Sequence, residues 1–356
     1  MTSKLGKPLA TVRRGVAIAS LLAAAVAPTW VGAQDAEVGD GKPWRDYHAA
    51  MQGKKVAFVP MAMSFDIAQA YDGAMRQRAA ELGYEYVERD PNWSVEGAVQ
   101  VAEQYIGEKP DIMVIHPLDD KAFNRVLRKA KDAGIYVIFM NLRSGAGTDA
   151  LGGNVYIGAD HYAVGKKKVE LAAHYCENAA SKKIALIQAP LTNAVGIAET
   201  AGTVEALKSH RELELVAQQS ADADANKAKS IASTILKQHP DLCAIIDQWD
   251  GQGIGIPPAI AEAGLTGKVA LITSGSGSQT NACDKVADGS YTAYVSHDIG
   301  TQTFLLNATI AQVLQTKPSS DAPPYQVYVD SPVITKESLA STPCWNLDFI
   351  TRPLTQ

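Results

Sequence analysis

Cysteine is scarce in this chain, and its distribution excludes several kinds of site. None of the four cysteines lies before Cys176, so no lipid-modified amino-terminal cysteine is available. No Cys-x-x-Cys pair and no His-Glu-x-x-His motif occurs, and the seven histidines show no other metal-ligand spacing. The sequence therefore predicts neither a metal site nor a cofactor.

Motifs of common enzymes are missing too. No Gly-x-Ser-x-Gly elbow occurs, and "SGSGSQ" lacks the Lys-Ser/Thr pair of a phosphate-binding loop. In "GQGIGI" Ile256 stands where a dinucleotide-binding loop has its third glycine, and Asp250 beside it would repel a pyrophosphate. We therefore expect no catalytic residues and no enzyme activity.

A long hydrophobic run is absent after the first part of the chain. Before it, the basic residues Lys4, Lys7, Arg13 and Arg14 precede a short apolar run, Val16–Ala27, and small residues at Val31–Ala33. This pattern is typical of a secretory signal peptide cleaved after residue 33, with export to the periplasm. An uncleaved anchor is the alternative, which the short apolar run disfavours. "TVRRGV" leaves open whether export uses the general or the twin-arginine route.

Positive charge is in short supply once this leader is removed. Taking its four basic residues from 33 leaves 29 against 38 acidic residues, a formal charge of −9. An acidic protein of this kind is a poor partner for nucleic acid or for an anionic membrane surface.

Apolar strand segments alternate with amphipathic helices from Lys54 onward. "KKVAFVP" (54–60) reads as a strand and "SFDIAQAYDGAMRQRAAELGY" (64–84) as a helix, and the pattern repeats through both halves. Near-continuous apolar strands separated by helices are typical of parallel sheets covered on both faces. A single sheet would need about ten strands. We therefore predict the α/β class, with two doubly wound parallel-sheet lobes.

Polar and aromatic residues follow the strands where ligands bind in such sheets. Trp249 offers a flat apolar face with a polar N–H, and Asp66, Asn141, Arg143 and Asp250 offer charged or paired hydrogen-bonding groups. Stacking combined with fork-like hydrogen bonds suits a sugar ring. Core packing of Trp249 and helix capping by Asp66 and Asp250 are the alternatives. We expect Trp93 to pack beside a helix cap.

Several segments resemble the ribose/galactose-type periplasmic sugar-binding proteins that feed ABC importers. "YDGAMRQRAAELGYEYVERD" and "DIMVIHPLDDKAFNRVLRKAKDAGIYVI" are similar to two blocks of that family, and the similarity runs from about Lys54 to Ile334. The resemblance implies the type I periplasmic binding protein fold, with three crossings between the lobes near Ala159–Asp160, His297–Ile299 and Val329–Asp330. It also implies closure of the hinge around a bound ligand.

Carried over position by position, the family's contacts fall on a changed set of residues. Its first pocket loop falls on Met63–Ile67, and its glutamine at the second crossing falls near His297, for which a hinge hydrogen bond is the alternative. Trp249 stands where the family often has asparagine, and Ile197 where it has arginine. The expected ligand-binding residues are Phe65, Asp66, Asn141, Arg143, Trp249, Asp250, Ser274 and His297.

These observations predict a monomeric periplasmic solute-binding protein that binds a neutral sugar or polyol and delivers it to an ABC permease in the inner membrane. The alternatives are an aromatic or amine-bearing ligand, and a sensor that presents its ligand to a receptor kinase. The expected divisions are a signal peptide at 1–33 and a short segment at 34–53, followed by two lobes. The first lobe comprises 54–159 plus 298–329, and the second comprises 160–297 plus 330–356.

All four cysteines fall in the second lobe of this scheme, where an even set can pair in an oxidising compartment. Cys344 lies in a terminal tail that would need fastening, so we favour Cys283–Cys344, with Cys176–Cys243 as a second bridge. We expect neither bridge to tie one lobe to the other. Buried free thiols are the alternative.

Overall fold

Two six-stranded sheets form the framework of this protein. The computed structural model describes residues 41–119, 121–142 and 153–353, so the expected signal peptide, residues 34–40 of the segment 34–53 and the candidate Arg143 lie outside the described residues. Residues Arg45–Gln356 form one unit by their contacts. Within the described residues, no helix combines the length and the apolarity that a membrane span requires.

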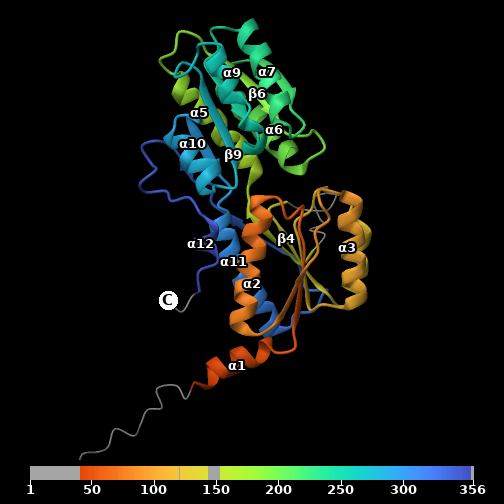
Figure 1. Ribbon diagram of the computed structural model, residues 1–356. Coiled ribbons are helices and arrows are strands. Elements are labelled where there is room, and N and C mark those ends of the chain that lie inside the picture. The colour runs from red at the N-terminus through yellow and green to blue at the C-terminus, as the bar shows by residue number, and fades with distance from the viewer. Residues whose placement is uncertain (1–40, 120, 143–152, 354–356) are drawn as a thin grey trace, which may run out of the picture. The chain divides into compact units, whose positions relative to one another are not determined.

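The first sheet has the strand order β11-β5-β4-β3-β1-β2, and all of its pairs are parallel. Helices α2 and α11 lie on one of its faces and α3 on the other (Figure 1), and a separate apolar cluster fills each side. Its elements, with the helix that precedes them, are α1 (Lys42–Met51), β1 (Lys55–Val59), α2 (Asp66–Leu82), β2 (Glu85–Glu88), α3 (Val95–Glu108), β3 (Ile112–Ile115), α4 (Asn124–Asp132), β4 (Tyr136–Met140), β5 (Val155–Ala159), α11 (Ile299–Thr316) and β11 (Tyr325–Val329).

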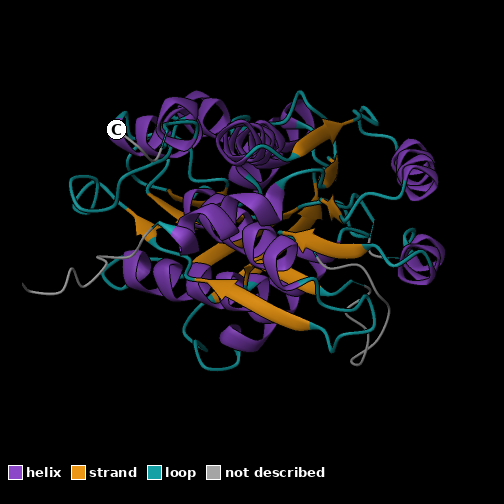
Figure 2. Ribbon diagram, turned by 90° about the horizontal axis from the view of Figure 1, so that it is seen from below, coloured by secondary structure: helices purple, strands orange, loops and turns teal. Residues whose placement is uncertain are grey.

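The second sheet repeats this design with the order β12-β10-β9-β8-β6-β7, in which only the short β12 runs antiparallel. Helices again cover the strands, with apolar clusters beneath α5 and α6 and beneath α7 and α9. In the view from below, helices surround the strands (Figure 2). The elements are α5 (His161–Cys176), β6 (Lys183–Gln188), α6 (Ala194–Leu207), β7 (Glu214–Ser220), α7 (Ala225–Gln238), β8 (Ala244–Asp247), α8 (Asp250–Gly253), α9 (Ile256–Glu262), β9 (Ala270–Gly275), the π-helix η1 (Gln279–Cys283), α10 (Asp284–Ala287), β10 (Ala293–Ser296), β12 (Val333–Ile334) and α12 (Leu347–Ile350).

The chain passes three times between the two sheets, at the places predicted from the resemblance. It leaves the first sheet after Ala159 and returns after Ser296, at the end of β10. It crosses a third time between Val329 of β11 and Val333 of β12. The fold class predicted from the alternation of strands and helices, two doubly wound parallel lobes, is confirmed.

Side-chain caps begin some of the helices but not α2, which lies beside the candidate site. Ser94 caps α3 by accepting a hydrogen bond from the Gly97 amide at 2.9 Å. Asp66 does not cap α2, because it is the first helical residue and its Oδ1 accepts only the neighbouring Ile67 amide. The carboxylate of Asp66 is therefore available for other partners.

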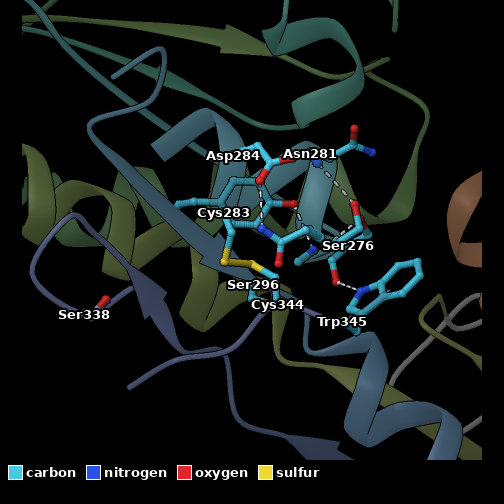
Figure 3. The surroundings of a disulfide bond; sticks show 12 residues. Ser276, Asn281, Cys283, Asp284, Ser296, Ser338, Cys344 and Trp345 are labelled. Atoms are coloured by element: carbon cyan, nitrogen blue, oxygen red, sulfur yellow. Dashed lines mark hydrogen bonds between the residues drawn. A yellow bond between two sulfur atoms is a disulfide. The ribbon is translucent and has the colours of Figure 1, made fainter. Parts of the chain in front are cut away.

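Both predicted disulfides are present, and the tail beyond one of them reaches further than expected. Cys283 pairs with Cys344 and Cys176 with Cys243. Trp345, the residue after the first of these bridges, donates its indole N–H to the Ser276 carbonyl at 2.8 Å (Figure 3), yet its ring belongs to the apolar cluster under α2 and α11.

The expectation that residues 330–356 belong to the second lobe is therefore corrected for the end of the tail, whereas the expectation that neither bridge ties one lobe to the other holds. Helix α12 contacts α2 of the first lobe, and Ile350 packs on the same cluster as Trp345. The physical reason is that packing these apolar side chains against the first lobe removes their surface from water. The bridge itself stays within the second lobe, but the tail that it anchors contacts both.

Candidate functional site

Aromatic rings from both lobes meet at the carboxyl ends of the strands. The Phe65 ring lies 5.3 Å from that of Trp93 and stacks on His116 at 6.1 Å, measured between ring centroids. Trp249, which follows β8 of the second lobe, approaches Phe65 edge to face at 6.1 Å. We call Phe65, Trp93, His116 and Trp249 the aromatic cluster.

Glycine explains how Trp249 can occupy this position. A Cβ atom added to Gly251 would lie 2.3 Å from Cζ2 of the indole, so the ring rests directly against the backbone of its own loop. Trp249 is half-buried, whereas the preceding residues of β8 are fully buried. The Gly-flanked loop thus presents the indole at the end of a buried strand, where ligands bind in sheets of this kind.

The side chain of Asp66, the residue after Phe65, makes polar contacts between the two lobes. Its Oδ2 accepts hydrogen bonds from Ser276 Oγ at 2.8 Å and from Asn281 Nδ2 at 2.9 Å. Both donors belong to the second lobe, one after β9 and the other in η1. The carboxylate is half-buried, so it combines a lobe-to-lobe contact with access to solvent.

Asp250 is a second carboxylate in the same neighbourhood, but it is buried. Tyr294 donates its hydroxyl to Asp250 Oδ2 at 2.6 Å, and the lack of a side chain at Gly275 leaves room for the carboxyl group. Burial first, and then the negative charge of Asp66, raise the pKa of Asp250 well above its ordinary value. Within the described residues, no lysine or arginine is hydrogen-bonded to either carboxylate.

Three other predicted contacts are grouped around His161 and Glu199 near the crossings. Asn141 is buried in a left-handed conformation with φ +57°, and its carbonyl accepts from Tyr156 Oη at 3.2 Å. Ser274 is fully buried and accepts from the Lys168 ammonium at 2.9 Å. His297 is buried next to Glu199. Their surroundings favour a structural role, because neighbouring protein groups already surround them.

Two positions remain, Arg143 and Ile197, and neither supplies a positive charge to the described site. Arg143 lies outside the described residues, so its position relative to the two carboxylates is not part of the structure. Ile197, which stands where the resemblance expects an arginine, is an exposed apolar residue. The described site is consequently acidic and aromatic.

The fold brings two residues to this place that were not among the expected ligand contacts. Trp93 packs beside a helix cap, as expected: its ring contacts Phe65, the N-cap residue of α2, and its indole N–H donates to Ser64 Oγ at 3.1 Å, while the residue stays 45% exposed. Asn281, the third residue of η1, gave no signal in the sequence, because its position relative to Asp66 depends on both lobes.

Two hollows in the described surface lie apart from the aromatic cluster. One of about 700 Å³ is lined by residues at the amino ends of the second sheet's strands, including Lys268 and Tyr291. The other, of about 580 Å³, lies beside the tail and is lined by Phe304 and Trp345 among others. Neither is lined by the aromatic cluster, although the second includes Gly277 and Ser296, which lie just after β9 and at the end of β10.

The aromatic cluster and the two carboxylates beside it offer groups that can bind a ligand. Rings offer stacking surfaces to apolar C–H faces, and the two carboxylates offer acceptors to hydroxyl or ammonium hydrogens. Asp66 connects both lobes, so a molecule bound there would contact both of them. This arrangement can couple binding to the relative position of the lobes.

This chain is similar in sequence to known proteins over most of its length. Residues 56–318 match the family described as "Periplasmic binding protein domain". The D-allose-binding periplasmic protein of Escherichia coli (strain K12) is 32% identical over 228 residues, which cover 62% of this chain and 71% of the relative. A xylitol-binding protein of Mycolicibacterium smegmatis is 24% identical over 83% of this chain and 80% of its own length.

Solved structures share the fold at lower identity. A solute-binding protein of an ABC transporter from Actinobacillus succinogenes, with bound D-allose, superposes with a TM-score of 0.70 at 23% identity, covering 80% of this chain and 98% of that one. Another, from Burkholderia graminis in complex with D-arabinose, gives a TM-score of 0.72 at 19% identity over 82% and 98% of the two chains. With its two parallel-sheet lobes, its three crossings and this match over residues 56–318, the chain belongs to the periplasmic binding protein family.

Proposed function

We propose that this protein is the periplasmic solute receptor of an ABC importer and binds a neutral sugar or polyol between its lobes. Asp66 carries this proposal, because its carboxylate lies beside an aromatic cluster drawn from both lobes and already bonds to the opposite lobe. Relatives named for D-allose and xylitol add support. A cleaved signal peptide, monomeric action and docking on a permease belong to the same proposal.

The proposed mechanism is closure of the hinge on the ligand. The aromatic rings stack on the C–H faces of the sugar, and Asp66 and Asp250 accept hydrogen bonds from its hydroxyls. A ligand shifts the equilibrium toward the closed form only by the extra contacts that it makes there. In that form Ser276 and Asn281 hold Asp66 in place, and the closed surface is the one that a permease would recognise.

A second ligand class is favoured by one specific observation. Within the described residues, two carboxylates lie beside three aromatic rings without a lysine or arginine bonded to them. Carboxylates and rings together also suit an ammonium group. An amine-bearing solute is therefore the alternative ligand at the same site.

A thermal-shift screen tests both candidates. Purified protein is heated with D-allose, D-ribose, D-arabinose, xylitol, amino sugars, polyamines, aromatic acids and sugar phosphates. A shift with a neutral sugar or polyol supports the proposal, and a shift confined to the amines selects the alternative. A shift confined to sugar phosphates or aromatic acids would contradict both, since an anion would meet the carboxylate of Asp66.

A further inference from the structure

Three buried side chains meet where the chain passes between the lobes. His161 begins α5 directly after the first crossing, His297 follows β10 at the second, and Glu199 comes from α6. The Glu199 Oε1 atom lies 4.0 Å from His161 Nδ1 and 3.7 Å from His297 Nε2, and the two imidazole rings are 4.7 Å apart. Each side chain is at least 92% buried.

The surroundings of His161 determine which of its ring nitrogens carries the hydrogen. Its Nε2 lies 2.8 Å from the backbone carbonyl of Asn141, and a carbonyl can only accept, so Nε2 is the donor. In the neutral imidazole only one ring nitrogen carries a hydrogen. The Nδ1 atom then has a lone pair that faces the Glu199 carboxylate.

This arrangement leaves buried polar atoms without partners. Within the described residues, His161 Nδ1 and both nitrogens of His297 form no hydrogen bond. An unpaired buried polar atom destabilises the folded state, so native structures normally supply it with a partner. Here the Nδ1 lone pair and the Glu199 Oε1 atom, both electron-rich, lie 4.0 Å apart, which favours an electropositive atom bound to both.

We propose that His161 Nδ1, His297 Nε2 and Glu199 Oε1 bind a divalent transition-metal ion such as Zn²⁺. The three atoms lie within 4.8 Å of one another. Donors around tetrahedral zinc, about 2.1 Å from the ion, are about 3.4 Å apart, so small side-chain rotations bring them into range. Two imidazoles and one carboxylate suit zinc, cobalt or nickel rather than calcium or magnesium.

The proposed ligands form hydrogen bonds of the kind that orient the ligands in known metal sites. A ligating histidine usually donates its other N–H to a carbonyl or carboxylate, as His161 donates to Asn141. The second oxygen of Glu199 accepts the Lys168 ammonium, and Ser274 Oγ lies 3.2 Å from Glu199 Oε1. The carboxylate is thus fixed with Oε1 facing the two rings.

The charges around the proposed metal site determine its affinity for an ion. The Lys168 ammonium, which also donates to the Asp247 carbonyl at 2.8 Å, opposes a second cation, while Glu199 and the buried carboxyl group of Asp247 favour one. Lys168 bonds to the far oxygen of Glu199, so the repulsion is weaker than it would be at Oε1. We therefore expect moderate affinity, and binding that links the first two crossings to α6.

Co²⁺ is the probe, because its visible absorption bands report tetrahedral coordination. The full mature chain is freed of metal with a chelator and titrated with Co²⁺, both as the native protein and during refolding from urea with its disulfides intact, which removes any barrier to entry. We expect bands that saturate at one equivalent per chain, their loss on addition of Zn²⁺, and a higher thermal midpoint with either ion.

Single variants separate this site from other histidines. His161→Gln and His297→Gln should each weaken Co²⁺ binding at least about tenfold. His174→Gln, on the exposed side of the same helix α5, is the matched control and should bind as the parent protein does. Circular dichroism establishes that each variant is folded, and Glu199→Gln provides a third ligand variant should either histidine variant unfold.

Three results would overturn the proposal. One is the absence of tetrahedral Co²⁺ bands in both the native and the refolded protein. Another is binding that the ligand variants leave unchanged. A crystal grown with Zn²⁺ that holds only a water molecule between the two rings would likewise show that the gap is filled by water, which can donate to both His161 Nδ1 and Glu199 Oε1.

Discussion

Trp249 and Asp250 are neighbours in the chain, yet the loop after β8 sends them in different directions. The indole is half-buried and meets Phe65 across the lobes, whereas the carboxyl group of Asp250 is buried against Tyr294. Removing the first should leave the second lobe's interior intact. Removing the second would leave the Tyr294 hydroxyl buried without its partner.

Trp249→Ala should therefore reduce ligand affinity far more than stability. We expect a loss of about 2–4 kcal/mol in binding free energy for the sugar selected by the screen, the range of central aromatic contacts. Isothermal titration calorimetry measures it. Trp44→Ala, at a tryptophan 63% exposed, is the control and should bind normally. An unfolded Trp249→Ala protein, or equal effects in both variants, would assign the indole to another role.

Asp247 makes stability depend on pH in a defined direction. Burial raises its pKa to about 6, against hydrogen bonds from Thr273 and Gln252 that favour the charged form. Between the unfolded value of about 4 and the folded value of about 6, the folded protein binds the extra proton. The contribution of Asp247 to the free energy of unfolding is therefore fully present below about pH 4, and it is lost as the pH rises through about 6.

Asp247→Asn removes this titration. The free energy of unfolding of the parent protein, relative to that of the variant, should fall by about 2–3 kcal/mol from pH 4 to pH 6 and then level off. Urea unfolding at a series of pH values measures the difference. Parallel curves for the two proteins would show that Asp247 does not titrate in this window.

At the scale of elements, close packing of α5 against α6 holds Lys168 beside Glu199. The two helices make the most extensive contact of any pair in the described structure, and glycines permit it. A Cβ atom at Gly202 would lie 2.0 Å from the Tyr162 carbonyl oxygen, and one at Gly165 would lie 2.1 Å from that of Glu199. Backbone cannot rotate away as a side chain can, so one helix would have to move.

Gly202→Ala should accordingly destabilise the protein by about 1–3 kcal/mol through overpacking. Gly107→Ala is the matched control, because Gly107 also lies in a helix, α3, and a Cβ there meets nothing within 4 Å. That control should be neutral or stabilising by up to about 1 kcal/mol. Denaturant unfolding measures both. Equal midpoints for the two variants would contradict the close approach of α5 and α6.

At the scale of the whole molecule, the tail after Ile334 connects elements far apart in the sequence. The bridge Cys283–Cys344 anchors it to the second lobe, and Trp345 and Ile350 pack under the helices of the first. The other bridge, Cys176–Cys243, joins the end of α5 to the start of β8 and stays within the second lobe. The two bridges should thus differ in what their loss does to the first lobe.

Replacing Cys283 and Cys344 by serine should cost about 2–4 kcal/mol of stability and also expose α2. Hydrogen exchange followed by mass spectrometry should show faster exchange in α2 and α11, because the anchor for Trp345 is gone. The Cys176→Ser/Cys243→Ser protein is the control, with a comparable loss of stability and unchanged exchange in α2. Unchanged exchange in both proteins would mean that the tail docks without its bridge.

The sequence by itself determined the class of fold and which residues follow its strands. Alternating apolar strands and helices specify parallel sheets because each element's own side-chain pattern decides which faces it buries. The sequence placed Trp249 and Asp250 directly after a strand because a strand end is a local feature, and both follow β8 in the structure. Only the tertiary structure decided which distant residues meet. Asp66 with Asn281, and His161 with Glu199 and His297, come together through strand order and helix packing, and no spacing along the chain records those distances.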